Sequence, residues 1–137
     1  MRVNMIVESI IKKYSLQANV PNQCATVYST ECRELLKIDG NWYLKTPDSM
    51  LRQLYAQHIS KGHYGFAIGA PTPKSWVLCL IEILNRLIEL DPHHFEIQQI
   101  KTRYGEIIFK VSSQRFTDID RVQKTITTAM SEKKLIY

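Results

Sequence analysis

The chain has 137 residues, and its 18 lysine and arginine residues outnumber its 13 aspartate and glutamate residues, which gives a formal net charge of +5. This length suits a single domain over residues 1–137 and is too short for two full ones. A content of 45% hydrophobic and 23% charged residues, with only 5 Gly and 5 Pro, excludes a disordered or collagen-like chain. The longest apolar run, Trp76–Ile81, is far shorter than the ~20 residues that a membrane span needs, so we expect no membrane partner.

The basic excess favours acidic partners such as nucleotides, nucleic acid or an acidic protein surface. The cations are spread along the chain, however, so an ordinary solvated surface explains them equally well. The three cysteines, Cys24, Cys32 and Cys79, are odd in number and form no C-x-x-C pair, which predicts neither a disulfide framework nor a zinc site. Because no signal peptide pattern is visible either, we expect a reduced, cytoplasmic location.

Four elements are expected in the first half of the chain. Apolar residues recur at helical spacing over Arg2–Ser15, which predicts an amphipathic helix followed by a loop to residue 20. A short strand is expected at Cys24–Tyr28. Asp39-Gly40 favours a tight turn and so predicts a hairpin with arms Leu35–Ile38 and Asn41–Leu44, although a short helix over Glu31–Lys37 is the alternative.

The next segment predicts a second helix and a fourth strand. Thr46-Pro47-Asp48-Ser49 is typical of a helix start, and helical periodicity continues to Ile59 with Gly62 as the closing cap. His63–Gly69 is expected to form a short strand bounded by glycines.

The second half predicts a central helix, a hairpin and a closing helix. Trp76–Leu90 is apolar apart from one polar stripe, so it should be the main helix of the core. Alternation over Phe95–Ile100 and Ile107–Val111 predicts the second hairpin. A capping box at Thr117–Asp120 predicts a last helix, and residues 132–137 are expected to be a flexible tail.

These elements predict an α+β fold. Strands joined by tight turns pair antiparallel, so we expect one antiparallel sheet, built from the two hairpins and the short strand, packed against about four helices.

The sequence lacks the signatures of well-known catalytic sites. It contains no G-x-S-x-G, H-E-x-x-H or phosphate-binding G-x-x-x-x-G-K-[ST] pattern. The four histidines show no metal-ligand spacing, and the paired acids Asp118 and Asp120 are explained by the first turn of a helix. We therefore expect no catalytic residues, no metal and no cofactor, and we expect a protein that is not an enzyme.

One segment does carry the chemistry of anion recognition. Residues 98–105 bring two glutamines, two cations and an aromatic ring around a predicted turn. Arg103 can grip a phosphate with two hydrogen bonds, Lys101 adds a point charge, Tyr104 offers a stacking face, and Gln99 can read a base edge. The alternative is an ordinary solvated turn. Arg115 and Trp76 are further candidate contacts.

The same residues carry a resemblance. Gly65-Phe66-Ala67-Ile68-Gly69, Trp76 at the start of a helix, and the segment from Gln99 to Phe109 resemble a group of small, uncharacterised phage and prophage proteins. Those proteins read roughly G-F-x-x-G, then W, then Q-[IV]-K-x-[KR]-[FY]-G. The match spans about Leu54 to Met130, and the resemblance implies a bacterial cytoplasmic setting rather than a mechanism.

The chain departs from that pattern in three places. Ala70–Ser75 replaces an Asp-Gly pair before the tryptophan, and Ile108 stands where a basic residue is usual. The cysteine-rich end of many members is missing, so no metal role carries over.

Together these observations predict a non-enzymatic binding protein that sequesters an anionic, nucleotide-like ligand or signal of host defence. The contacts would come from Gln99, Lys101, Arg103 and Tyr104, with Arg115 and Trp76 nearby. The alternatives are a module that inhibits a host defence or transcription protein and a nucleic-acid-binding protein. Exposed aromatic residues also favour a homodimer.

Overall fold

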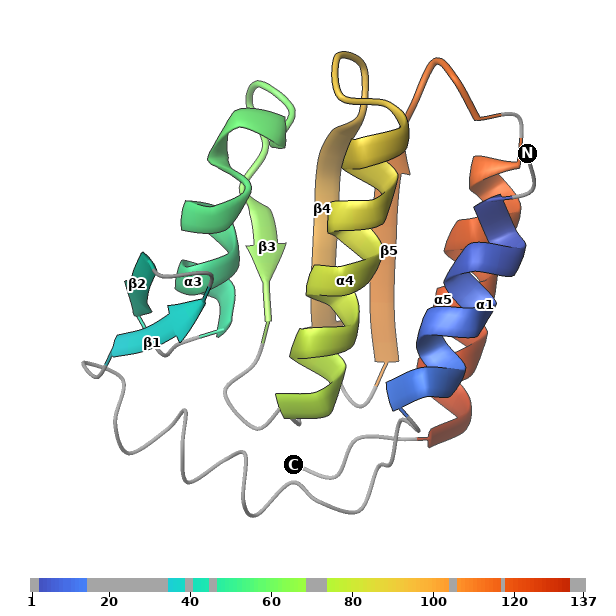
Figure 1. Cartoon of the computed structure of the whole chain (residues 1–137), viewed down its shortest axis with the longest axis horizontal. Helices are drawn as coiled ribbons and strands as arrows, with labels where there is room; N and C mark the ends of the chain where they lie inside the picture. The colour runs from blue at the N-terminus through green and yellow to red at the C-terminus, as the bar shows by residue number, and fades with distance from the viewer. Residues whose placement is uncertain are drawn as a thin grey trace.

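The computed structural model of the chain describes residues 3–14, 35–38, 41–44, 47–68, 74–103, 106–116 and 118–133. The elements, in chain order, are α1 (Val3–Tyr14), β1 (Leu35–Ile38), β2 (Asn41–Leu44), α3 (Pro47–Leu54), the 3₁₀ helix η1 (Ala56–His58), β3 (Gly65–Ala67), α4 (Lys74–Leu90), β4 (Glu96–Arg103), β5 (Glu106–Ser112) and α5 (Ile119–Lys133). Helices and strands alternate around a small sheet, which confirms the predicted α+β class (Figure 1).

The predicted single antiparallel sheet is wrong. The strands form a two-stranded antiparallel sheet of β1 and β2 and a separate three-stranded sheet in the order β3-β4-β5. In the second sheet β3 is parallel to β4, while β4 and β5 form the expected antiparallel hairpin. Parallel pairing follows from the connection, because the chain leaves β3, runs through the whole of α4 and re-enters the sheet in the same direction.

Helix α4 organises the core. Seven core side chains of this helix, including Trp76, Leu80, Leu84 and Leu87, have at most 1% of their surface exposed. They pack against the inward row of β4 and β5, which includes Ile97, Ile100, Ile107 and Phe109. The predicted role of this segment as the central helix is therefore confirmed, although the helix begins at Lys74, two residues earlier than expected.

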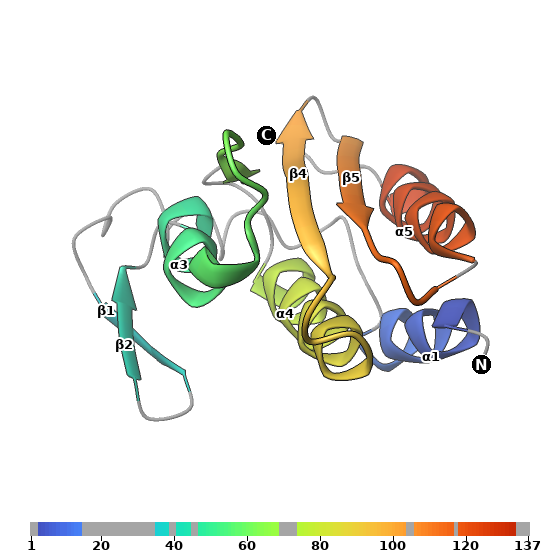
Figure 2. The same ribbon diagram turned by 90° about the horizontal axis from the view of Figure 1, so that it is seen from above.

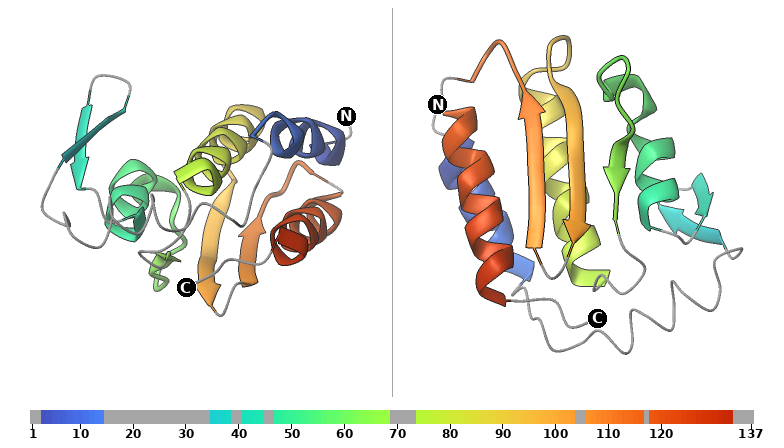
Figure 3. Two further views of the ribbon diagram at one scale, coloured as in Figure 1. Left: turned by 90° about the horizontal axis from the view of Figure 1, so that it is seen from below. Right: turned by 180° about the vertical axis from the view of Figure 1, so that it is seen from behind.

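The helices cover one face and both edges of the three-stranded sheet. Viewed from above, α4 and α1 lie on one face, α3 lies beyond β3 and α5 lies beyond β5 (Figure 2). The side chain of Gln123 on α5 accepts a hydrogen bond of 2.7 Å from the backbone N–H of Val111, so α5 satisfies one backbone donor at the outer edge of β5. None of the described helices lies over the opposite face of this sheet, as the views from below and behind also show (Figure 3).

Several element boundaries differ from the predicted ones. Helix α3 ends at Leu54 rather than at Gly62, because η1 follows and Ile59 then bridges to Ile97 of β4. The arms of the second hairpin are longer than expected, and α5 continues to Lys133, into the expected tail. The predicted strand at Cys24–Tyr28 and the hairpin turn at Asp39-Gly40 lie outside the described residues. None of the helices in the described ranges has the length and apolar character of a membrane span.

Candidate functional site

Two of the predicted contact residues lie on the uncovered face of the sheet. The side chains of Gln99 and Lys101 alternate with the buried Ile100 along β4, so both point away from α4. Arg103 ends β4, and its side chain, like the whole of Tyr104, lies outside the described residues. The structure therefore brings Gln99 and Lys101 to one face.

The other two predicted contacts lie elsewhere. Trp76 is fully buried in the core with 0% of its surface exposed, so its ring packs against other side chains and does not reach the sheet face. Arg115 follows the far end of β5, where Ser112 pairs with Glu96, whereas Arg103 pairs with Glu106 at the opposite end. A strand of eight residues spans roughly 25 Å, so Arg115 and the turn are too far apart to grip one small ligand.

The two glutamines lie in the middle of the sheet and not around the turn. Gln99 pairs with Gly65 on one side and Lys110 on the other, four positions before the pair that closes the hairpin. The register shifts between Ile97 and Gln99, which makes Gln98 the extra residue of a β-bulge. Because of this bulge, Ile97 and Ile100 both face the core, while Gln98 and Gln99, although consecutive, both line the same pocket.

That pocket has a volume of about 390 Å³ and lies on the uncovered face of the sheet. We call it the sheet-face pocket. It is lined by the following residues: Asp48, Arg52, Gly62, His63, Tyr64, Gly65, Phe66, Ala67, Gln98, Gln99 and Lys110. The pocket draws on α3, the loop after η1 and all three strands of the sheet, so no short segment of sequence contains it.

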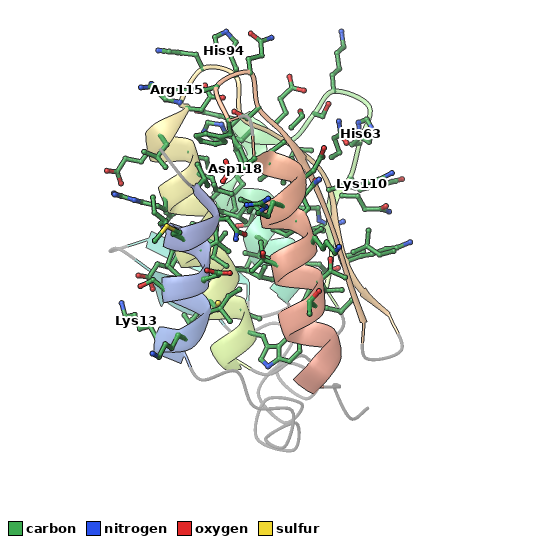
Figure 4. The ribbon with its side chains drawn as sticks, turned by 90° about the vertical axis from the view of Figure 1, so that its right-hand side faces the viewer. Lys13, His63, His94, Lys110, Arg115 and Asp118 are labelled. Carbon is green, nitrogen blue, oxygen red and sulfur yellow. The ribbon has the colours of Figure 1, made fainter. Side chains whose placement is uncertain are left out.

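The charged groups of the sheet-face pocket leave a positive excess. Asp48 and Arg52 are one turn apart on α3 and form an ion pair of 3.4 Å between Asp48 Oδ2 and Arg52 Nη2, which offsets both charges. Lys110 is exposed on β5 and forms no ion pair with any described residue. His63 lies on the same side of the molecule as Lys110, opposite Lys13 on α1 (Figure 4). The lysine is therefore the principal cation that a bound anion would meet.

An exposed aromatic ring stands at the rim of the same pocket. Tyr64 has 84% of its surface exposed, although a large side chain of this kind usually buries most of its apolar area. Its position directly before β3 places the ring beside the strand residues that line the pocket. Tyr64 therefore offers a flat apolar surface next to polar groups, as a stacking site for a planar ligand requires.

Gly65 lets the chain turn sharply between Tyr64 and β3, where both residues line the pocket. Its backbone has φ +80°, and a Cβ added there would lie 2.8 Å from the Ile59 side chain. Only glycine tolerates both the positive φ and the close approach. The loop after η1 can then turn into β3 while Ile59 remains bridged to Ile97.

A second polar cluster lies at the end of the sheet that carries Arg115. Asp91 is 3% exposed and accepts a hydrogen bond from the Ser113 hydroxyl, and His94 Nδ1 lies 3.5 Å from Asp91 Oδ1. Burial alone raises the pKa of Asp91, but the hydrogen bonds from Ser113 and from the backbone N–H groups of His94 and Gln114, with the charge of His94, lower it overall. Asp91 thus ties the turn after α4 to the segment after β5, which is a structural role.

The described residues contain no set of three or more His, Cys, Asp or Glu side chains that could hold a metal ion. Cys79 is fully buried on α4, and burial, with a smaller contribution from the charge of Glu82, raises the pKa of its thiol to about 12. The thiol therefore stays protonated and enclosed, which excludes it as a nucleophile.

Comparison of the chain with models of protein families, with curated proteins and with solved structures found no match. The resemblance to small phage proteins therefore remains a prediction from the residues that carry it.

Sequence reasoning found part of this site. It singled out Gln99 and Lys101, and the adjacent Gln98 stood in the same segment. It missed Tyr64 and Lys110, because these residues are far from that segment in the chain and are joined to it only by the parallel pairing of β3 and the register of β5. The signal in the sequence that could have found Tyr64 is its position directly before Gly65, at the start of a short strand that glycines bound.

Proposed function

We propose that this protein binds an anionic, nucleotide-like ligand without chemically changing it, and that the ligand lies in the sheet-face pocket. The observation that carries this proposal is the meeting, in one pocket of about 390 Å³, of two carboxamides, an exposed aromatic ring and a lysine that forms no ion pair with any described residue. This volume lies within the range of small-molecule sites, which runs from about 300 to 1,000 Å³.

Each part of a nucleotide has a matching group in the pocket. Lys110 supplies a point charge for a phosphate, and His63, on the same side, adds a second donor. Tyr64 supplies a stacking face for a planar base. Gln98 and Gln99 supply donors and acceptors for polar groups on the base edge. An apolar ligand would leave all of these polar groups unpaired, which costs free energy.

The proposed site differs from the predicted one in its centre. The main contacts were expected around the turn, from Gln99, Lys101, Arg103 and Tyr104, whereas the pocket takes only Gln98 and Gln99 from the described part of β4. Lys101 lies two residues further along the same face, so its ammonium group would extend the positive charge from the pocket toward the turn. A ligand with more than one phosphate could use both lysines.

Binding without turnover fits the groups that line the pocket. Among the described residues that line it, the only carboxylate is that of Asp48, which accepts hydrogen bonds from the Ser49 backbone N–H at 2.9 Å and from Arg52 at 3.4 Å, so it is already engaged. In the phage setting that the resemblance implies, such binding would sequester a nucleotide signal from host defence. A homodimer would then offer two pockets per particle.

Titration calorimetry of the full-length protein tests the proposal. The probes are ADP, GDP, CDP, UDP and inorganic pyrophosphate, each at low and high salt. We expect at least one diphosphate to bind at about one per chain, with an affinity that falls as salt screens Lys110. The absence of binding by all five probes, or tight binding of a single-stranded oligonucleotide alone, would contradict the proposal.

A further inference from the structure

We infer that the sheet-face pocket selects ligands that carry a chain of two or more phosphates, and that Lys110 and Lys101 bind neighbouring phosphates of that chain. This inference rests on the proposed function and adds the class of ligand, whichever base it carries. It starts from the register of β4 and β5, which places the two lysines diagonally across the uncovered face of the sheet.

The pairing of the strands brings the two lysines close together. Lys110 on β5 pairs with Gln99, and Lys101 lies two residues beyond Gln99 on β4. Such diagonal neighbours share one face of a sheet and are about 7–8 Å apart. The buried Ile100 and Phe109 pair on the opposite face, so both lysines point away from the core, toward the face that the view from behind shows uncovered by the described helices (Figure 3). Two flexible lysine stems at this spacing can bring their ammonium groups to one short phosphate chain.

Neither lysine has its charge offset within the described part of the chain. The ion pairs between described residues involve other cations. The strand neighbours of Lys101 are Ala67 and Ile108, and that of Lys110 is Gln99, so all three are uncharged. Two cations held this close repel each other, and a polyanion bound between them removes that repulsion.

Two acids that border this face are already engaged. Asp48 forms its ion pair with Arg52 at 3.4 Å. Glu96 accepts a hydrogen bond of 3.2 Å from the Ser60 hydroxyl and begins β4, at the end away from Lys101. These contacts hold both carboxylates beside other groups, so the positive charge of the two lysines stays available to a ligand.

The two lysines differ in their position relative to the pocket. Lys110 lines it, whereas Lys101 lies just beyond its wall at Ala67, the residue of β3 with which Lys101 pairs. Ala67 contributes only a methyl group between the pocket and Lys101. The first phosphate of a nucleotide in the pocket would therefore meet Lys110, and the next phosphate along the chain would meet Lys101. A monophosphate would engage Lys110 alone.

Pairs of ligands that differ by one phosphate test this inference in the wild-type protein. The pairs are AMP and ADP, GMP and GDP, CMP and CDP, UMP and UDP, and inorganic phosphate and pyrophosphate. Titration in buffer with EDTA keeps magnesium from covering the phosphates. For each base that binds, and for the inorganic pair, we expect the compound with two phosphates to bind about tenfold more tightly or better, because it gains a second charge-assisted contact.

Variants then assign the second contact to Lys101. Lys101→Gln keeps most of the side-chain length and removes the charge, so diphosphate affinity should fall to the monophosphate level while monophosphate affinity stays within about twofold. Lys110→Gln should weaken both, and Lys101→Arg, which keeps the charge, should keep the preference. Lys124→Gln, on the exposed surface of α5 outside the pocket, makes the same change in net charge and should alter neither affinity. Thermal unfolding checks that each variant is folded.

The two proposals fail in different ways. Equal binding of monophosphates and diphosphates by the wild type would overturn this inference and leave the proposed function intact. A preference for diphosphates that is unchanged in the folded Lys101→Gln variant, or reduced as much in Lys124→Gln, would do the same. The absence of binding by every nucleotide and by pyrophosphate would overturn the proposed function and, with it, this inference.

Discussion

The backbone N–H of Asn4 donates a hydrogen bond of 3.1 Å to Asp118 Oδ2, which joins the first turn of α1 to the residue that precedes α5. The carbonyl of Asp118 also accepts the N–H of Val122, as expected of a residue that caps α5. One carboxylate therefore lies at the positive ends of two helices that are 114 positions apart in the chain.

Loss of this carboxylate should destabilise the fold. We expect Asp118→Ala to lower the free energy of unfolding by about 1–2 kcal/mol, because it leaves the N–H of Asn4 on α1 without its partner and removes a negative charge from the positive end of α5. Asp120→Ala is the matched control, since Asp120 is exposed in the first turn of the same helix and does not contact α1. Urea unfolding that shows equal losses for the two variants would refute the role of Asp118 as a link between the helices.

The pH dependence of stability should report on Asp91. Its folded-state pKa is lowered, so the carboxylate stabilises the fold above its unfolded pKa of about 3.9, and this contribution is lost as the pH falls through the folded value. Ser113→Ala, which removes one donor, should cost about 1 kcal/mol at pH 7.

The measurement for Asp91 is the difference in unfolding free energy between wild type and Asp91→Asn. We expect this difference to be largest at neutral pH and to shrink below pH 4, where the wild-type carboxylate becomes protonated. A difference that is constant from pH 7 to pH 3 would show that the charge of Asp91 is not stabilising.

Gly65 should be intolerant of substitution. Gly65→Ala places a Cβ against Ile59 and keeps a positive φ, so we expect a loss of about 2 kcal/mol or more. Gly62→Ala has a similar φ of +85° but open space around the added Cβ, so it should cost only about 1 kcal/mol. The double variant Ile59→Ala with Gly65→Ala tests the cause by urea unfolding. If it is no more stable than expected from adding the two single losses, the close approach to Ile59 does not explain the cost of Gly65→Ala.

Trp76 should matter for stability and not for binding. Because its ring is fully buried among core residues, we expect Trp76→Ala to cost about 3–5 kcal/mol. The milder Trp76→Phe should lower the thermal midpoint and leave the affinity of the folded protein for nucleotides unchanged. A selective loss of affinity with an unchanged midpoint would return Trp76 to the list of ligand contacts.

The sequence predicted most of the secondary structure but not the pairing of strands. Strong periodicity located α1, α4 and α5, the turn residues Asp39-Gly40 located the first hairpin, and alternation of apolar residues located the second. A three-residue strand such as β3 carries no pattern that identifies its partner, so its parallel pairing with β4 depends on the packing of α4. Helical spacing also extended α3 to Ile59, a residue that instead bridges to Ile97 because this contact buries it against the sheet.

The site was predictable only where its residues are adjacent in the chain. Gln99 and Lys101 share a face because alternate strand residues do. The bulge at Gln98 depends on the register between β4 and β5, and Lys110 and Tyr64 reach the pocket only through tertiary structure. Trp76 was misassigned because an aromatic residue at a helix start has the same local pattern whether it faces a ligand or the core.

The most direct test of the account is the titration of ADP into the wild-type protein, Lys110→Glu and Lys124→Glu. Lys124 is an exposed lysine on α5, outside the pocket, so its reversal makes the same change in net charge. We predict binding of about one ADP per chain to the wild type and to Lys124→Glu, and an affinity at least tenfold weaker for Lys110→Glu, because a charge-assisted contact contributes about 1.5–3 kcal/mol. Equal affinities in the two variants, or no binding of ADP or of any other tested diphosphate to the wild type, would contradict the placement of an anionic nucleotide in the sheet-face pocket.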